Sequence, residues 1–369
     1  MVKTCSLQDV VTNQLDARAT SSQWLAGIVG ENPSKYAKSP SIWNPVLQAI
    51  GLDAFYSPFD VASANLAAFV EAVRQDQRMK GFSVTMPYKT AIIPLLDELD
   101  GRAKSIGAVN VVVRRKDGRL VGANTDGSGG LASLTTPLSA EGEPFIRQLQ
   151  GSRVLLIGSG GAGKALAWYL AEAIGAGTLY VANRSRSSGD ELCRSIRSVN
   201  PTAVYVESNA IGITARKVDL VVNATTVGQS GVRLLTEGRV ICLEPYSPLV
   251  NSNPAQVRAA AGQDPRSVYE ACYRDSLLDI QNNNLRSASL MTQVPASVRF
   301  LDIVYSPLET TLLRQARLSG HQTLNGKGMN ICQAADALFH WVFQSHFEEA
   351  GRYETTTYRS IVERMCSVW

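Results

Sequence analysis

Short apolar runs alternate with stretches of helical periodicity along most of this chain. The apolar runs are typical of strands and occupy residues 24–29, 55–59, 81–85, 108–114, 120–122, 154–157, 178–182, 218–226 and 301–305. Between them, apolar residues recur at helical spacing in residues 39–50, 64–74, 89–96, 165–171, 310–318 and 329–347, with Ser39 as the predicted N-cap of the first helix. This alternation favours an α/β fold with mostly parallel sheets covered by helices.

A polar segment divides the pattern into two domains. Residues 135–142 are rich in Thr, Ser, Pro and Gly, so we predict a hinge within residues 127–150. We expect an N-terminal extension at residues 1–22, a first domain at 23–128, a second domain at 150–310 and closing helices at 311–369. Residues 231–297 are rich in Asn, Ser and Arg, with weak helical patterns at 255–261 and 268–280, and are predicted to form an insert in the second domain.

Composition narrows the class of protein. The chain has 369 residues, 45% hydrophobic and 18% charged, which suffices for about two globular cores. A net charge of +4 is too small to predict a nucleic-acid surface, and no apolar run approaches the roughly 20 residues that span a bilayer. The six cysteines have no regular spacing, which favours reduced thiols and a cytoplasmic protein. The pattern does not indicate an oligomeric state.

Histidine is scarce, which limits the available chemistry. The only three, His321, His340 and His346, lie near the C-terminus and away from any cysteine cluster. This placement argues against a zinc site and against a Ser-His-Asp triad. We therefore expect acid–base chemistry to use lysine or carboxylate side chains.

A glycine-rich turn follows the strand at 154–157 and precedes a helix. Its glycines are Gly158, Gly160 and Gly163, the G-x-G-x-x-G spacing of a dinucleotide-binding loop. Such glycines permit a tight turn and a close approach of the backbone to a pyrophosphate at the helix N-terminus. Glycine turns of this kind also occur for packing alone, and that alternative stays open on this motif by itself.

The end of the next strand carries the signal for the type of dinucleotide. Strand 178–182 is followed by Asn183, Arg184, Ser185 and Arg186, about 20 residues beyond the glycine loop, where NAD-binding units carry an acid. The nearest acid, Asp190, lies well past the strand end. Because guanidinium groups bind phosphate in a bidentate fork, this position favours NADP. A solvated basic turn is the alternative.

Seven segments, in order, resemble the shikimate dehydrogenase family. They are residues 81–89, 106–110, 122–126, 158–162, 183–185, 302–307 and 326–329, the last leading to Gln333, within a span of 23–345. The resemblance implies an N-terminal α/β substrate domain, a Rossmann domain that binds NADP, and a small cyclic hydroxy acid bound in the cleft between them. It also implies that the C-terminal helix returns to the first domain.

The resemblance assigns roles to individual residues. Lys89 and Asp126 correspond to the family's acid–base pair, while a lysine at a helix start is the structural alternative. The corresponding substrate-binding residues are Ser39, Ser83, Thr85, Asn110, Tyr305 and Gln333. The last four of these are polar residues at strand or helix ends and could equally be caps. The corresponding cofactor-binding residues are Gly158, Ser159, Gly160, Gly161, Ala162, Asn183, Arg184, Ser185, Arg186, Asn223, Thr225, Ile303, Gly326 and Met329.

The chain departs from the family pattern in two motifs. The family's Ser-x-Ser-Pro is Ala37-Lys38-Ser39-Pro40 here, and the Asn of its Asn-Val-Thr is Ser83. The resemblance implies that the first motif holds the substrate carboxylate, so Ala37 removes one hydroxyl donor there. A hydrogen bond to a charged carboxylate contributes about 1.5–3 kcal/mol, so substrate affinity should fall about 10- to 150-fold unless another group replaces that hydroxyl. In addition, residues 231–297 are longer than the corresponding family segment.

These departures leave three functions in play. The first is an NADP-dependent dehydrogenase that interconverts shikimate and 3-dehydroshikimate. The second is a dehydrogenase of the same family that acts on quinate or an aminated analogue. The third is a non-catalytic ligand sensor, against which the retained Lys89, Asp126 and glycine loop argue, since a binding protein needs no hydride donor.

Overall fold

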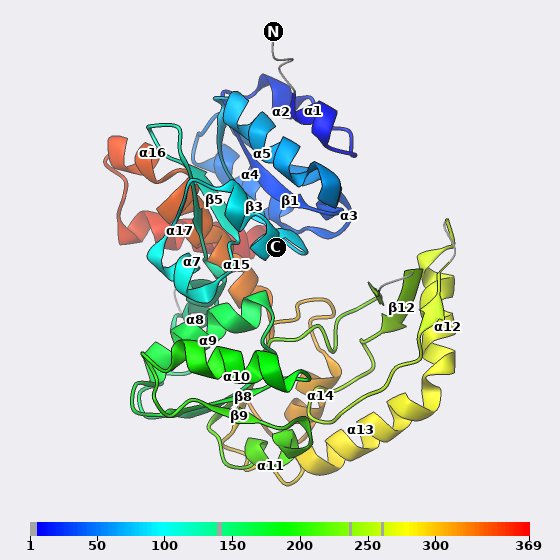
Figure 1. Ribbon diagram of the computed structural model, residues 1–369. Helices are drawn as coiled ribbons and strands as arrows, with labels where there is room; N and C mark the ends of the chain where they lie inside the picture. Colours follow the sequence, from blue (N-terminus) through cyan, green and yellow to red (C-terminus); the bar gives the residue numbers. More distant parts are fainter. Residues whose placement is uncertain (1–5, 139–141, 236–237, 260–261) are drawn as a thin grey trace. The chain divides into compact units, whose positions relative to one another are not determined.

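The computed structural model describes residues 6–138, 142–235, 238–259 and 262–369. Its contacts divide the chain into two compact units, Met1–Pro144 with Met329–Trp369, and Phe145–Gly328 (Figure 1). In the described residues no helix is both long and apolar enough to span a lipid bilayer.

The first unit contains a mixed sheet of six strands in the order β2-β1-β3-β5-β6-β4. The strands are β1 (Trp24–Gly30), β2 (Ala54–Asp60), β3 (Met79–Val84), β4 (Glu98–Leu99), β5 (Val111–Arg114) and β6 (Leu120–Ala123). β1 pairs in parallel with β2 and β3, whereas β5 pairs antiparallel with β3 and β6. The sheet is therefore mixed: its parallel strands are followed by the β5–β6 hairpin, and the turn signal at Lys116-Asp117-Gly118 between two apolar runs predicts this hairpin correctly.

Helices cover both faces of this sheet because alternate strand residues are apolar on each side. Leu25 and Val29 of β1 belong to one buried cluster, with α5 (Leu66–Gln75), while Ala26 and Ile28 belong to the other. The second cluster includes α4 (Ser39–Ala49), the π-helical turn Ala337–Val342 and α17 (Thr355–Val368). The remaining helices of the unit are α1 (Leu7–Val10), α2 (Arg18–Ser21), α3 (Pro33–Tyr36), α6 (Tyr88–Ala91), α7 (Gly101–Ile106), α8 (Asp126–Thr135), α15 (Lys327–Asp336) and α16 (Gln344–Glu349).

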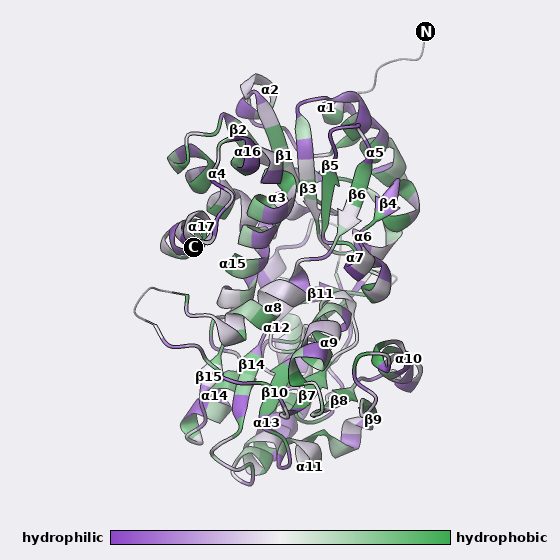
Figure 2. Ribbon diagram, turned by 90° about the vertical axis from the view of Figure 1, so that its left-hand side faces the viewer, coloured by the Kyte–Doolittle hydropathy of each residue, from purple (hydrophilic) through white to green (hydrophobic). Residues whose placement is uncertain are grey.

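The second unit is built on a six-stranded parallel sheet in the order β15-β14-β10-β7-β8-β9. The strands are β7 (Arg153–Ile157), β8 (Thr178–Ala182), β9 (Val204–Val206), β10 (Leu220–Asn223), β14 (Arg299–Asp302) and β15 (Thr323–Leu324). Hydrophobic colour runs along β7, β8 and β10 in Figure 2, as expected for strands buried on both faces. The helices of this sheet are α9 (Gly161–Ile174), α10 (Arg186–Ile196), α11 (Ile211–Ala215), α13 (Leu277–Met291) and α14 (Thr311–Leu318).

The segment predicted as an insert forms a small layer of its own. Its strands β11 (Val232–Leu234), β12 (Arg239–Cys242) and β13 (Val257–Arg258) make an antiparallel sheet, and α12 (Pro265–Asp275) packs on it. The helix predicted at 255–261 is therefore wrong where it is described, since β13 lies there, and residues 260–261 fall outside the described residues. The pattern predicted at 268–280 is split between α12 and α13.

Other predicted boundaries also differ from the structure. Residues 6–22 of the predicted N-terminal extension pack on the first unit, where Leu7, Val10 and Ala19 are buried. Residues 127–135 of the predicted hinge belong to α8, and residues 139–141 of that hinge lie outside the described residues. α14 packs on β14 in the second unit, so the return to the first unit begins at Met329 rather than at 311.

Local helix details were also imperfectly predicted. Lys38, not Ser39, is the N-cap of α4. The helix expected over 89–96 is interrupted: α6 ends at Ala91, and a 3-10 turn covers Ile93–Leu95, where Pro94 cannot donate a backbone hydrogen bond. The helix expected over 329–347 is divided by the π-helical turn.

Candidate active site

A lysine–carboxylate pair lies beside the ends of β3 and β6. Lys89, on the short helix α6, places its Nζ 2.6 Å from Oδ2 of Asp126. Asp126 occupies the first turn of α8, where the positive end of the helix dipole favours a carboxylate. The Asp126 side chain is 8% exposed and that of Lys89 is 21% exposed, so the ammonium retains access from outside.

Asn110 fixes this carboxylate from the opposite side. Its Nδ2 donates to Oδ1 of Asp126 at 2.9 Å and lies 3.3 Å from Oε1 of Gln333. The orientation of the Asn110 amide is set because its Oδ1 accepts from the backbone N–H of Thr125 at 2.7 Å. Both oxygens of Asp126 are therefore engaged, and the ammonium of Lys89 is held in one direction.

Gln333 reaches this cluster because α8 and α15 approach closely. A Cβ added at Gly129 would lie 2.5 Å from the backbone nitrogen of Gln333, so a larger residue would separate the helices. Thr125 adds a hydrogen bond from its hydroxyl to the carbonyl of Gln333 at 3.0 Å. Four of the predicted site residues, Lys89, Asp126, Asn110 and Gln333, are thus brought together within the first unit.

Three hydroxyls form a second polar cluster in the same unit. Tyr56 of β2 donates from its hydroxyl to Oγ of Ser83 on β3 at 2.8 Å. Burial raises the pKa of the Tyr56 phenol, while hydrogen bonds with Ser83 and Ser39 oppose the shift. Since the Ser83 oxygen accepts from Tyr56, its own hydrogen is free to donate to an acceptor such as a carboxylate. The ring of Tyr56 packs on Trp43, with centroids 4.4 Å apart.

Sequence reasoning missed Tyr56. The register pairs Tyr56 with Ala26 and Ser83 with Ile28, which places both side chains on one face of the sheet two residues apart along β1. No local motif marks this tyrosine. Thr85 was predicted, and the structure places it just after β3, where its N–H donates to the carbonyl of Val29 at 2.9 Å.

The glycine loop of the second unit can approach a phosphate closely. Gly158 follows β7 with φ of 112°, a conformation that favours glycine. A Cβ at Gly163 would lie 2.3 Å from the Gly158 carbonyl oxygen, whereas one at Gly160 would meet open space. α9 begins at Gly161 and Ala162 follows, and the N–H groups of a first helical turn have no acceptor within the helix. These features fit a pyrophosphate at the start of α9.

The two arginines after β8 differ in their surroundings. Arg186 forms ion pairs with Glu207 and, at 3.4 Å, with Asp190. Arg184 is exposed and has no side-chain partner within the described part of the chain, so its guanidinium is the one available to a 2′-phosphate. The neighbouring residues are structural: Oδ1 of Asn183 accepts from the N–H of Ser159 at 3.3 Å, and Ser185 caps α10.

The ends of β10 and β14 are tied to each other. Nδ2 of Asn223 donates to Oδ1 of Asp302 at 2.9 Å, and Oδ1 of Asn223 accepts from the N–H of Thr225 at 3.1 Å. Oδ2 of Asp302 accepts from the Thr310 hydroxyl at 2.7 Å, and burial raises the pKa of Asp302 to about 7 in spite of these hydrogen bonds. Asn223 therefore shapes the loop, and the backbone of Ile303 is placed by its N–H bond to the Asn223 carbonyl at 3.0 Å.

The last predicted site residues are divided between the units. Tyr305 and Gly326 belong to the second unit, and Met329 belongs to the first. A Cβ at Gly326 would lie 1.9 Å from the Ile303 carbonyl oxygen, so only glycine fits beside that strand end. Burial raises the pKa of the Tyr305 phenol.

Metal-binding chemistry has no candidate centre in the ranges that the structure describes. Within them, no group of three or more His, Cys, Asp or Glu side chains could hold an ion. Cys193, Cys242, Cys272, Cys332 and Cys366 are free thiols.

Both units of the chain resemble domains of known proteins. Residues 28–112 match the family model of the shikimate dehydrogenase substrate binding domain, and residues 141–240 match that of shikimate / quinate 5-dehydrogenase. The chain is 34% identical to the shikimate dehydrogenase (NADP(+)) of Geobacter metallireducens over 319 residues, covering 85% of this chain and 90% of the relative.

Two solved structures share the fold along most of both chains. The shikimate 5-dehydrogenase of Listeria monocytogenes, in complex with shikimate and NAD, has a TM-score of 0.63 and 25% identity over 92% of this chain and 99% of its own. The quinate dehydrogenase of Corynebacterium glutamicum, in complex with NAD, has a TM-score of 0.64 and 25% identity over 92% and 98%. With its matching domain models and its Geobacter relative, the chain belongs to the shikimate dehydrogenase family, a family of oxidoreductases.

Proposed function

We propose that this protein is an NADP-dependent dehydrogenase that interconverts shikimate and 3-dehydroshikimate. The observation that carries the proposal is the Lys89–Asp126 pair, with a 2.6 Å contact, braced by Asn110 at 2.9 Å. Oxidation of a secondary alcohol requires a group that takes the hydroxyl proton and a hydride acceptor. A bound NADP supplies that acceptor.

Lys89 exchanges the proton with the reacting oxygen. Its Nζ is held on one side by Asp126 and remains partly exposed, so a substrate hydroxyl can approach the ammonium from the open side. Asp126 orients the lysine, and the lysine donates its proton to the reacting oxygen during ketone reduction. Asn110 and Gln333 offer amide groups next to this position, suited to the hydroxyls of a cyclic acid.

The hydroxyl cluster of Ser39, Tyr56 and Ser83 is the candidate subsite for the substrate carboxylate. Ser83 has a hydrogen to donate because Tyr56 already donates to its oxygen. This arrangement compensates for the two departures from the family pattern. Ser83 occupies the position of the usual Asn, and the Tyr56 phenol, which hydrogen-bonds to Ser83, adds a hydroxyl to the cluster in place of the one missing at residue 37. Thr85 and Tyr305 complete the set that we assign to the substrate.

The glycine loop and Arg184 support NADP as the cofactor. The loop at Gly158, Gly160 and Gly163 has the open backbone that a pyrophosphate needs, and Arg184 carries the charge that a 2′-phosphate would pair with. The Geobacter relative is named for NADP(+). We assign the remaining loop ends, at Asn223, Thr225, Ile303, Gly326 and Met329, to the cofactor side of the site.

A four-way assay tests the proposal. Initial rates with shikimate and quinate, each with NADP and NAD, should give the highest kcat/KM for shikimate with NADP. Lys89→Ala should lower kcat about 10²- to 10⁴-fold, the contribution of a positioned acid–base group. Lys104→Ala, which removes an exposed lysine on α7, is the matched control and should leave the rates unchanged.

The outcomes separate the candidate functions. Ala37 and Ser83 favour quinate or an aminated analogue as the second candidate, because both alter the donors near the acid subsite. A higher kcat/KM with quinate would select that function. Absence of turnover with every pair, together with tight shikimate binding, would select a non-catalytic sensor. Equal rates for wild type and Lys89→Ala would reject the role of the lysine.

A further inference from the structure

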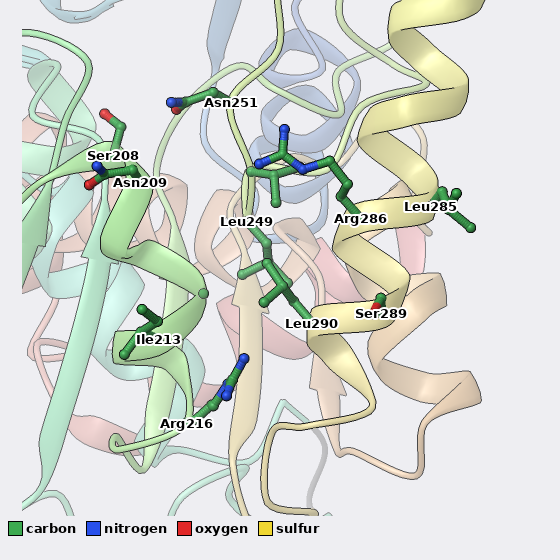
Figure 3. Close-up of a pocket in the computed structure, with 12 residues that line it drawn as sticks. Ser208, Asn209, Ile213, Arg216, Leu249, Asn251, Leu285, Arg286, Ser289 and Leu290 are labelled. Carbon is green, nitrogen blue, oxygen red and sulfur yellow. The ribbon is translucent and has the colours of Figure 1, made fainter.

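The insert builds a hollow on the second unit that the proposed reaction does not use. α11 and α13 touch at Gly212, where an added Cβ would lie 2.5 Å from Cδ1 of Leu290. Beside this contact lies a hollow of about 600 Å³ between α11, the loop at 249–251 and α13 (Figure 3). Two of its three walls come from residues 231–297, so the hollow depends on the segment that is long for the family.

The hollow carries positive charge without compensation. Arg216, at the end of α11, and Arg286, on α13, both line it, and no Asp or Glu does so. Nε of Arg216 is buried and has no hydrogen-bond partner in the described residues. Neither guanidinium forms an ion pair within those residues. An anion in the hollow would satisfy the buried donor and reduce the repulsion between two like charges.

The rest of the lining is suited to an apolar body. Leu249, which lines the hollow, is 1% exposed, and in the view of Figure 3 Leu290 lies between the guanidinium groups of Arg216 and Arg286. Asn209 and Asn251 add amide donors at the rim. Ligand sites commonly combine such apolar walls with a few polar groups that orient the ligand. The lining therefore matches a small molecule with one apolar part and one anionic group.

We propose that this hollow binds a small organic anion with an apolar body, through Arg216 and Arg286. None of the proposed substrate or cofactor residues lines the hollow, and the proposal does not depend on the proposed reaction. The hollow lies close enough to affect the cofactor loop, because the Ser208 hydroxyl at its edge is 3.5 Å from the carbonyl of Asn183, and Asn183 accepts from the glycine-loop residue Ser159. Because of this contact, competition with NADP is measured as well: displacement of a bound probe by NADP would assign the hollow to the cofactor site.

Two fluorescent probes with the same aromatic frame test the proposal. The anionic probe is 8-anilinonaphthalene-1-sulfonate, and the neutral control is N-phenyl-1-naphthylamine. With NADP at saturation, we expect the anionic probe to bind the full-length protein saturably. Arg286→Gln and Arg216→Gln should each weaken this binding about tenfold or more, the effect of one lost hydrogen bond to a charged group, and leave the neutral probe unaffected.

Controls make each outcome decisive. Arg274→Gln changes another insert arginine, one that does not line the hollow, and should leave both probes unchanged. Arg286 is exposed, so its substitution leaves the fold intact and the test stands even where Arg216→Gln does not fold. The proposal is overturned by non-saturable binding, by an equal loss for both probes, by unchanged affinity in Arg286→Gln, or by displacement of the probe by NADP. None of these results depends on turnover of shikimate.

Discussion

Replacing Asp126 by asparagine tests how Lys89, the proposed acid–base residue, is held. The substitution keeps the size of the side chain but turns one acceptor oxygen into an NH₂ donor. In the wild type, Oδ2 accepts from Lys89 at 2.6 Å and Oδ1 accepts from Asn110 at 2.9 Å. Asn110 cannot turn to adapt, because its own oxygen accepts from Thr125 at 2.7 Å. The new NH₂ must therefore face either the Lys89 ammonium or the Asn110 amide.

The cost follows from the hydrogen bond that is lost. A bond between charged groups contributes about 1.5–3 kcal/mol, so if the lysine position matters only in the reacting complex, kcat should fall about 10- to 150-fold. KM should change less than about threefold, because Asn110 and Gln333 remain in place. The fall should be smaller than in Lys89→Ala, since the proposed proton-transfer group is still present.

Steady-state kinetics with shikimate and NADP, with thermal melting as a check on folding, measure this effect. Asp97→Asn is the matched control: Asp97 forms a 2.6 Å ion pair with Arg74 at the other end of β6, bonded to the N–H of Leu120. It should leave kcat unchanged. A kcat for Asp126→Asn within about threefold of wild type, in a folded protein, would refute the positioning role.

Three further predictions concern other parts of the structure. Tyr56→Phe removes the 2.8 Å hydrogen bond to Ser83 but keeps the aromatic ring packed on Trp43, so KM for shikimate should rise about 2- to 10-fold. Tyr353→Phe, which removes the hydrogen bond between Tyr353 and His340, is the control and should leave KM unchanged. Arg184→Glu should lower kcat/KM with NADP about tenfold or more and affect NAD far less; equal losses would contradict the 2′-phosphate assignment. Burial raises the pKa of Asp302 to about 7 from 3.8, so the folded chain holds a proton that the unfolded chain releases as pH rises. Stability should thus fall from about pH 4 to pH 7, by roughly 4 kcal/mol, and the lower level should persist above pH 7. Chemical denaturation at several pH values across this range should show the free energy of unfolding falling with pH in wild type, and falling less steeply in Asp302→Asn.

Much of the chain could be predicted where the signal is local. The strand at 154–157 and the glycine loop after it lie within a dozen residues, and the structure has β7, the turn and α9 in that order. The segment at 255–261 shows the opposite case. Its residues suit a helix in isolation, but Val257 and Arg258 pair with Val240 and Arg239 of β12, and this pairing decides their conformation.

The candidate site residues also divide into those that a local motif predicts and those that only tertiary contacts bring together. Lys89 and Asp126 were recognisable from their motifs, although 37 residues separate them. Tyr56 was not recognisable, because only the register of β1 with β2 and β3 places its hydroxyl next to Ser83. The sequence does not distinguish Arg184 from Arg186 as a partner for the 2′-phosphate. The structure does, because Glu207, which follows the neighbouring strand β9, forms an ion pair with Arg186.

The amino-acid sequence by itself determined the alternation of strands and helices, the dinucleotide loop and the family, since each depends on residues close together or on motifs in a set order. The tertiary structure decided which polar groups meet: Asn110 against Asp126, the Tyr56 hydroxyl against Ser83, and, around one hollow, two arginines that form no ion pair with any residue the structure describes. Those meetings depend on sheet register and helix packing, which arise from contacts between distant parts of the chain. The direction of each donor in the candidate site is therefore a property of the folded unit.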